Sequence, residues 1–198
     1  MRTPDDKLAA RRREQILAAA YRCFVRTGFH STGMKAICTE AGLSPGAVYR
    51  YFPGKSDIIS ALVASEQKHV DRALEKLASA KDPAKALVRF AGQLAKDACK
   101  EPENILATEI FAEACRDQQI AAILRASEQA LVEALHRWIV SAVQAKTLAL
   151  HIKPLDMAQL VVSLGYGVSS YHLLDQRFGA SKAAELVQQA VKAQIQHG

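Results

Sequence analysis

The 198-residue sequence has only four cysteines, and none is spaced for a metal site or a disulfide framework. Cys23, Cys38, Cys99 and Cys115 lie far apart, and no histidine stands at zinc-finger distance from a cysteine pair. A disulfide scaffold and a zinc module are therefore not expected. We expect four reduced thiols, most of them buried, in a cytoplasmic protein.

Long apolar runs and catalytic motifs are also missing. No run approaches the roughly 18–20 residues needed to cross a bilayer, so no membrane helix is expected. The first residues hold Pro4, Asp5 and Asp6 without an apolar segment, so no secretory signal is expected. The chain has no Gly-x-Ser-x-Gly and no phosphate loop, and its histidines show no metal-ligand spacing. The sequence predicts no enzymatic activity, no metal and no cofactor.

The positive charge of the chain is confined to its first quarter. Residues 1–55 hold ten Lys and Arg against four Asp and Glu, which accounts for the whole net charge of +6. The remaining residues hold sixteen of each sign. A positive field restricted to one segment is typical of a domain that binds a polyanion such as nucleic acid, although a solvated basic surface gives the same count.

Hydrophobic residues recur at helical spacing, and no stretch alternates as a β-strand does. The pattern predicts an all-α fold. Asp82 followed by Pro83 predicts an N-cap and the first residue of a helix. The expected helices cover 15–27, 34–41, 44–52, 56–79 and 83–98, then a segment opened by Glu101-Pro102, a long helix from about 118 to 142, and finally 154–177 and 180–196.

The helix expected at 154–177 is apolar on more than one face, with Leu164 and Val168 among its residues. A helix of this kind is buried on two sides, and one side can belong to a second subunit. Gly165 and Gly167 would allow close helix approach there. We therefore expect a homodimer formed through residues 154–177 and 180–196.

Residues 31–55 predict a helix-turn-helix. Thr32 can cap a short helix at 34–41, and Gly42 ends it at positive φ. Ser44 then caps a second short helix with Pro45 at its first position. Two short helices joined through such a turn form this motif. Small residues at the start of the second helix allow it to enter a DNA major groove.

The run from Gly28-Phe29 through Thr32-Gly33-Met34-Lys35-Ala36-Ile37 to Ala41–Lys55 resembles the TetR/AcrR family of transcriptional regulators. The match is close over residues 11–60, and beyond them it extends only to helix number and length. Gly33 and Cys38 depart mildly from the pattern. The resemblance implies a three-helix DNA-binding domain, a long linking helix and a helical effector domain that dimerises.

The resemblance also implies site residues. Thr32, Tyr51 and Lys55 match positions that touch the phosphate backbone. Ser44, Pro45, Gly46, Ala47 and Tyr49 match the base-facing end of the recognition helix, and Lys35 and Arg50 complete the expected DNA-binding set. Tyr49 and Tyr51 could instead pack inside the domain, and Phe52 is expected in the core. The run Arg11-Arg12-Arg13 could reach DNA or lie along a solvated helix start.

The sequence of residues 56–198 identifies a binding site less specifically than residues 31–55 do. The family binds small molecules between helices, and the candidate lining residues here are Phe90, Leu94, Phe111, Trp138, Tyr166 and Tyr171, for each of which ordinary core packing is the alternative. Glu109 and Glu113 could neutralise a cationic ligand or lie on a solvated face. Because this half carries no net charge, an apolar or aromatic effector is expected.

The sequence thus predicts a ligand-responsive transcriptional regulator, most simply a repressor that binds a pseudo-palindromic DNA operator. Residues 1–55 form the expected DNA-binding domain, and residues 56–198 form the effector-binding and dimerisation domain. The alternative is a helical protein-interaction module without specific DNA binding.

Overall fold

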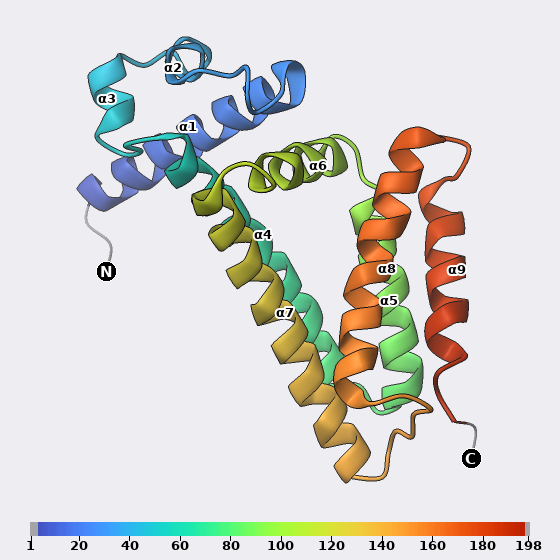
Figure 1. The fold of residues 1–198 in the computed structure, drawn as a ribbon. Helices are drawn as coiled ribbons and strands as arrows, with labels where there is room; N and C mark the ends of the chain where they lie inside the picture. Colours follow the sequence, from blue (N-terminus) through green and yellow to red (C-terminus); the bar gives the residue numbers. More distant parts are fainter. Residues whose placement is uncertain (1–3, 197–198) are drawn as a thin grey trace. The chain divides into compact units, whose positions relative to one another are not determined.

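The computed structural model describes residues 4–196, apart from the side chains of 4–5 and 66–70. The described part forms nine α-helices (Figure 1), and its one β feature is an isolated antiparallel bridge between Leu150 and Ile195. The all-α prediction is confirmed. The helices are α1 (Pro4–Thr27), α2 (Met34–Ala41), α3 (Pro45–Tyr49), α4 (Lys55–Ala78), α5 (Pro83–Ala98), α6 (Glu103–Ala114), α7 (Gln118–Gln144), α8 (Pro154–Leu174) and α9 (Ala180–Lys192).

Local chemistry sets several of these boundaries as predicted. Gly28 and Gly42 follow α1 and α2 with φ of 78° and 64°, which a residue without Cβ adopts at low cost. The Ser44 hydroxyl accepts the Ala47 N–H at 3.3 Å, and the Asp82 carboxylate accepts the Lys85 N–H at 3.0 Å. Each cap satisfies a main-chain donor that the helix leaves unpaired, and each is worth about 1 kcal/mol.

Four helices differ in length from the prediction. Helix α1 begins at Pro4 instead of residue 15, because its first turns are rich in Ala and Arg, which favour a helix without giving an apolar stripe. Helix α3 ends at Tyr49 rather than residue 52, with Arg50 as its C-cap. Helix α8 ends at Leu174 instead of residue 177, where Asp175 adopts an extended conformation. Helix α9 ends at Lys192 instead of residue 196, with Ala193 as its C-cap.

The chain divides into two compact units. Unit 1 comprises Met1–Glu66 with Ile105–Arg125, and unit 2 comprises Gln67–Asn104 with Ala126–Gly198. The predicted division into domains 1–55 and 56–198 stays a prediction.

The core of unit 1 fastens the short helices to α1, to the start of α4 and to parts of α6 and α7. Ile37, Val48 and Phe52 are each 1% exposed or less, which confirms the expected core place of Phe52. Leu43 packs on the same core from the turn. Its further members are Ile16, Ala20, Cys23, Phe24, Phe29, Cys38, Ile58, Ile59, Leu106, Ile110 and Ile120.

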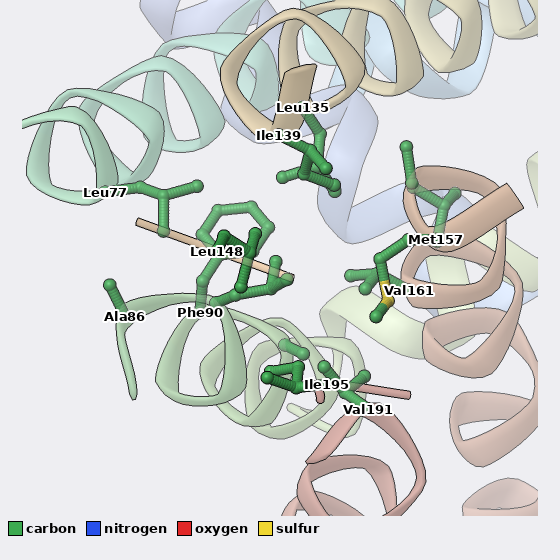
Figure 2. Close-up of a cluster of buried hydrophobic side chains, with 14 of the residues drawn as sticks. Leu77, Ala86, Phe90, Leu135, Ile139, Leu148, Met157, Val161, Val191 and Ile195 are labelled. Atoms are coloured by element: carbon green, nitrogen blue, oxygen red, sulfur yellow. The ribbon is translucent and has the colours of Figure 1, made fainter. Parts of the chain in front are cut away.

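The core of unit 2 gathers α5, α7, α8 and α9 around a second cluster of aliphatic side chains and Phe90 (Figure 2). Helix α5 packs against both α8 and α9. Leu87, Leu135, Ile139, Met157, Val161 and Val191 have no exposed surface. At about 25 cal/mol per Å² of apolar area, this burial is the main stabilising contribution in the unit.

Helix α8 has one apolar face that is covered within the chain, whereas its outward face mixes polar and apolar residues instead of being apolar as predicted. Met157 and Val161 lie in the unit 2 core, and Leu164 and Val168 pack against that core as partly buried residues. Gly165 is buried within the chain, and a Cβ there would make an ordinary contact with the Leu94 side chain at 3.8 Å. The close helix approach expected at Gly165 stays a prediction. The outward face carries exposed residues: Leu155, Asp156, Gln159, Ser163, Tyr166, Gly167, Ser170, Tyr171 and Leu174.

The thiols match expectation in burial. Cys23, Cys38 and Cys99 are buried, Cys115 is exposed, and all four are unbridged. Among the described residues, no helix combines the length and the apolarity that crossing a bilayer requires.

Gly92 allows α5 and α9 to approach closely. It is buried, and an added Cβ would clash with the Gln188 amide nitrogen and lie 2.6 Å from the Gln188 Cγ. We expect Gly92→Ala to lower the free energy of unfolding by about 1–3 kcal/mol, the usual cost of overpacking. Urea denaturation at fixed protein concentration measures this change. Gln188→Ala combined with Gly92→Ala should recover most of the loss, and a loss that persists would place the strain elsewhere.

Candidate nucleic-acid interface

The turn and α3 present an exposed face of small residues. Ser44, Pro45 and Gly46 are exposed, Ala47 is partly buried, and Val48 points into the core with no exposed surface. Tyr49 is 49% exposed, and its ring therefore lies on the outside rather than in the core. Tyr51 is partly buried against the unit 1 core. The structure thus brings five of the predicted base-facing residues onto one short, accessible segment.

Two arginines of α1 hold α2 in place. Glu40 lies 2.7 Å from the Arg22 Nε and 3.2 Å from an Arg26 nitrogen. These bonds hold the pKa of the Glu40 carboxyl below its usual range, with the Arg22 hydrogen bond the larger cause. The contribution of the carboxylate to stability is therefore present above its unfolded pKa and is lost as pH falls through the lowered one. These cations serve the fold, a role that their spacing in sequence did not reveal.

Arginines in the first half of α1 contact the residues that follow α2 and α3. Arg13 donates to the Tyr51 carbonyl at 3.2 Å, and its guanidinium lies 4.5 Å from the centre of the Phe52 ring. Arg12 donates to Gln15 at 2.8 Å, and Gln15 donates in turn to the Ala41 carbonyl at 2.7 Å. Two of the three arginines therefore make contacts within unit 1. The sequence suggested DNA contact or a solvated helix start for this run, and neither alternative included these contacts.

Thr32 does not cap α2. The N-cap is Gly33, which makes no side-chain bond, and the predicted cap is wrong. The Thr32 side chain is 1% exposed, and its hydroxyl donates to the Gly28 carbonyl at 2.7 Å. This bond joins the two ends of the loop between α1 and α2. The phosphate contact at this position stays a prediction, but this hydroxyl is not accessible for it. The main-chain N–H groups at the start of α2 are the remaining donors there.

In the loop between α1 and α2, both main-chain groups of Phe29 are hydrogen-bonded to charged side chains. Its N–H donates to a Glu109 carboxylate oxygen of α6 at 3.1 Å. Its carbonyl accepts the Lys55 ammonium at 3.0 Å, and the same ammonium lies 4.4 Å from the centre of the Phe29 ring. Lys55 also reaches the His30 carbonyl at 3.4 Å. The predicted phosphate anchor therefore has a structural task, which its position after the recognition segment did not indicate.

Glu113 lies on the same side of α6 as Glu109. Its carboxylate is 3.7 Å from the His30 Nδ1, an ion pair when the imidazole is protonated. Neither reading of the two carboxylates in the sequence, as a ligand counter-charge or as a solvated face, anticipated contact with the α1–α2 loop. The missing information was tertiary, because about 80 residues separate the partners.

Lys35 and Arg50 are exposed on either side of the base-facing segment, Lys35 in the first turn of α2 and Arg50 at the end of α3. In the chain these two exposed cations stand before and after the small residues Ser44–Ala47. Such a surface can approach a base-pair edge while the cations lie near phosphates.

The predicted effector residues are divided between the units. Phe90 is 8% exposed in the unit 2 core, and Leu94 and Trp138 pack against that core. Tyr171 is 53% exposed and stacks edge-on against Phe178, with 4.9 Å between the ring centres. Phe111 is 57% exposed and belongs to unit 1, so the six residues do not gather within one unit.

Tyr166 of α8 is the polar member of this set. Its hydroxyl bonds the Glu128 carboxyl of α7, within unit 2. Burial raises the pKa of Tyr166, and the neighbouring carboxylate raises it further. Burial also raises the pKa of Glu128. This tyrosine–carboxyl pair was missed in the sequence because the partners lie on different helices.

Comparison with known proteins agrees with this geometry. The family model described as "Bacterial regulatory proteins, tetR family" matches residues 16–62, which contain the second half of α1, all of α2 and α3, and the start of α4. The HTH-type transcriptional regulator UidR of Escherichia coli (strain K12) is 30% identical over 161 residues, which cover 79% of each chain. The regulator HbdR of Aromatoleum sp. (strain CIB) is 42% identical over 55 residues, 28% of this chain and 24% of that one.

Solved structures extend the likeness beyond the family model. Salmonella enterica GusR is 25% identical and superimposes with a TM-score of 0.79 over 92% of this chain and 94% of that chain. SmeT in its triclosan complex is 20% identical, with a TM-score of 0.77 over 94% and 93%, and supports the fold. The resemblance noted in residues 11–60 is confirmed, and the chain belongs to the tetR family of bacterial regulatory proteins.

Proposed function

We propose that this protein is a homodimeric transcriptional regulator whose binding to a pseudo-palindromic DNA operator is controlled by a small effector. The observation that carries the proposal is the exposed segment Ser44–Ala47 with Tyr49, flanked by Lys35 and Arg50 and held on a buried core. Family membership favours this function over a helical interaction module that binds no specific DNA. A role at chromosomal DNA places the protein in the cytoplasm, and repression by occupancy is its simplest action.

Two copies of the chain are needed for operator recognition. One recognition segment covers only a few base pairs, whereas a dimer places two of them in major grooves about 34–36 Å apart, or a multiple of that spacing. The proposed contact is the outward face of α8 together with α9. That face lacks charged side chains from Gln159 to Leu174 and carries Tyr166, Tyr171 and Leu174, the last 85% exposed. An uncharged, partly aromatic stripe suits burial against a second copy.

The effector is proposed to bind among the apolar side chains of unit 2. Leu94, Trp138 and Tyr166 lie on helices of that unit, and the Tyr166–Glu128 pair supplies a polar group beside them. Binding can lower operator affinity only if the effector prefers a conformation that DNA does not. Within unit 1, Glu109 of α6 is the residue through which such a change can reach the loop before α2.

The first test separates phosphate contact from loop support. We expect Lys35→Ala to weaken operator binding and to reduce the slope of log K against log salt by about one, with little change in melting temperature. Lys55→Ala should lower both operator affinity and melting temperature, because it also removes the bond to the Phe29 carbonyl. Fluorescence anisotropy between about 50 and 200 mM salt, together with thermal denaturation, measures both. A salt dependence that is flat for the parent protein would contradict phosphate contact altogether.

The second test concerns the dimer. Leu164 and Val168 pack on the core of their own chain, so charges there would disturb folding. Leu174→Asp is the better probe, because its side chain is exposed in the single chain. We expect monomers by sedimentation with unchanged helicity, because a charge buried without a partner costs several kcal/mol. Ala130→Asp, on an exposed position of α7, is the control and should stay dimeric. A dimeric Leu174→Asp protein would place the contact elsewhere.

The third test concerns the effector. Trp138 is the one tryptophan of the sequence, so its emission reports on binding nearby. An effector found by screening apolar and aromatic compounds should change this emission and lower operator affinity by the same factor by which DNA lowers effector affinity. Leu94→Ala should weaken effector binding and leave effector-free operator binding within a few fold. Phe111 belongs to unit 1 and is 57% exposed, so Phe111→Ala is the control and should leave effector affinity unchanged. Loss of effector binding in Phe111→Ala would contradict a site within unit 2.

A further inference from the structure

Pro45, Gly46 and Ala47 carry no polar group beyond the main chain. The hydroxyls on either side belong to Ser44, which accepts the Ala47 N–H of its own cap and keeps one O–H donor, and to Tyr49. Val48 is buried. The surface from Ser44 to Ala47 is therefore made of methylene, methyl and Cα groups, with one capping hydroxyl.

This composition limits which base edges can be recognised. Guanine is read by Arg or Lys, adenine by Asn or Gln, and cytosine by Asp or Glu, and none of these residue types stands between Ser44 and Tyr49. Arg50 is the C-cap at the far end of the helix, and Lys35 belongs to α2. In the major groove, the methyl group of thymine is the feature that apolar side chains contact.

We propose that Pro45, Gly46 and Ala47 select the operator through thymine methyl groups, so that each half-site contains thymines read by contact rather than by hydrogen bonds. The inference rests on the proposed function and deepens it, because it names the base chemistry that this surface takes.

Gly46 supplies the independent support. A Cβ built at this position meets no protein atom within 4 Å, and its φ lies outside the left-handed region. The fold therefore does not require glycine here, and alanine would even favour the helix. An added methyl would project from the exposed face, where in the proposed complex it would stand between the main chain and a base edge. The missing side chain thus serves close approach of the main chain to DNA.

The experiment begins with selection of an operator from random duplexes by the full-length protein. Each thymine of the selected operator is then replaced singly by deoxyuridine, which removes the methyl group and keeps the pairing and the O4 acceptor. We expect an affinity loss of about fourfold at two or more thymines of each half-site, the loss expected for about 0.8 kcal/mol per methyl-sized group returned to water. Thymines outside the half-sites should show no change.

Variants connect the methyl groups to the residues. In the Ala47→Gly protein, replacing one of the sensitive thymines by deoxyuridine should no longer lower the affinity. If Ala47→Gly does not fold, Pro45→Ala is tested against the same replacements. Gly46→Ala should keep or raise the melting temperature and weaken operator binding at least tenfold. The matched control is Gly179→Ala, where a Cβ also meets nothing within 4 Å, and which lies at the start of α9. It should leave operator affinity unchanged.

Two results would overturn the inference. One is an operator whose uracil-substituted forms all bind within twofold of the parent, while replacing a guanine by 7-deazaguanine abolishes binding, because hydrogen bonds would then carry the recognition. The other is a Gly46→Ala protein that binds the operator as tightly as the parent. A selection that enriches no sequence is a different result: the proposed function itself fails, and the inference with it.

Discussion

The peptide unit of Phe29 is the point on which the recognition surface depends. Its N–H is bound by Glu109, its carbonyl by Lys55, and its ring packs 5.1 Å from Phe24, centre to centre. Gly28 turns the chain immediately before it with positive φ, and the buried Thr32 hydroxyl closes the loop just after it. The direction in which α2 starts is set by this loop, and the position of the turn and α3 follows from α2.

This arrangement explains why a surface that binds a polyanion uses so many of its cations internally. Arg13, Arg22, Arg26 and Lys55 each bond an acceptor inside unit 1. A bond from a charged donor is stronger than a neutral one, so these cations can hold short helices that have little apolar area of their own. The local excess of positive charge therefore has two uses, and counting charges in the sequence overstates how many remain for DNA.

The sequence predicted the elements of unit 1 well because their signals are local. The positive φ at Gly42, the cap at Ser44 and the core position of Phe52 each follow from neighbouring residues. The contacts that position the surface could not be predicted in this way. Glu109 stands 80 residues from Phe29, and Lys55 stands 26 residues from it. The length of α1 was also missed, since an Ala- and Arg-rich start favours a helix without showing an apolar period.

Unit 2 shows a second limit of sequence patterns. An apolar helix with two faces indicates two partners, but not which residues meet which partner. Gly165 and Gly167 are two positions apart in sequence, and on a helix this places them on different sides. Gly165 is buried beside Leu94, whereas Gly167 opens to the outside with Tyr166 and Tyr171 on the uncharged stripe. No atom of the chain lies within 4 Å of a Cβ built at Gly167, so packing within the chain does not require glycine there, and the proposed second copy would explain it. The same reasoning applies to Gly46 in unit 1, where the proposed partner is DNA.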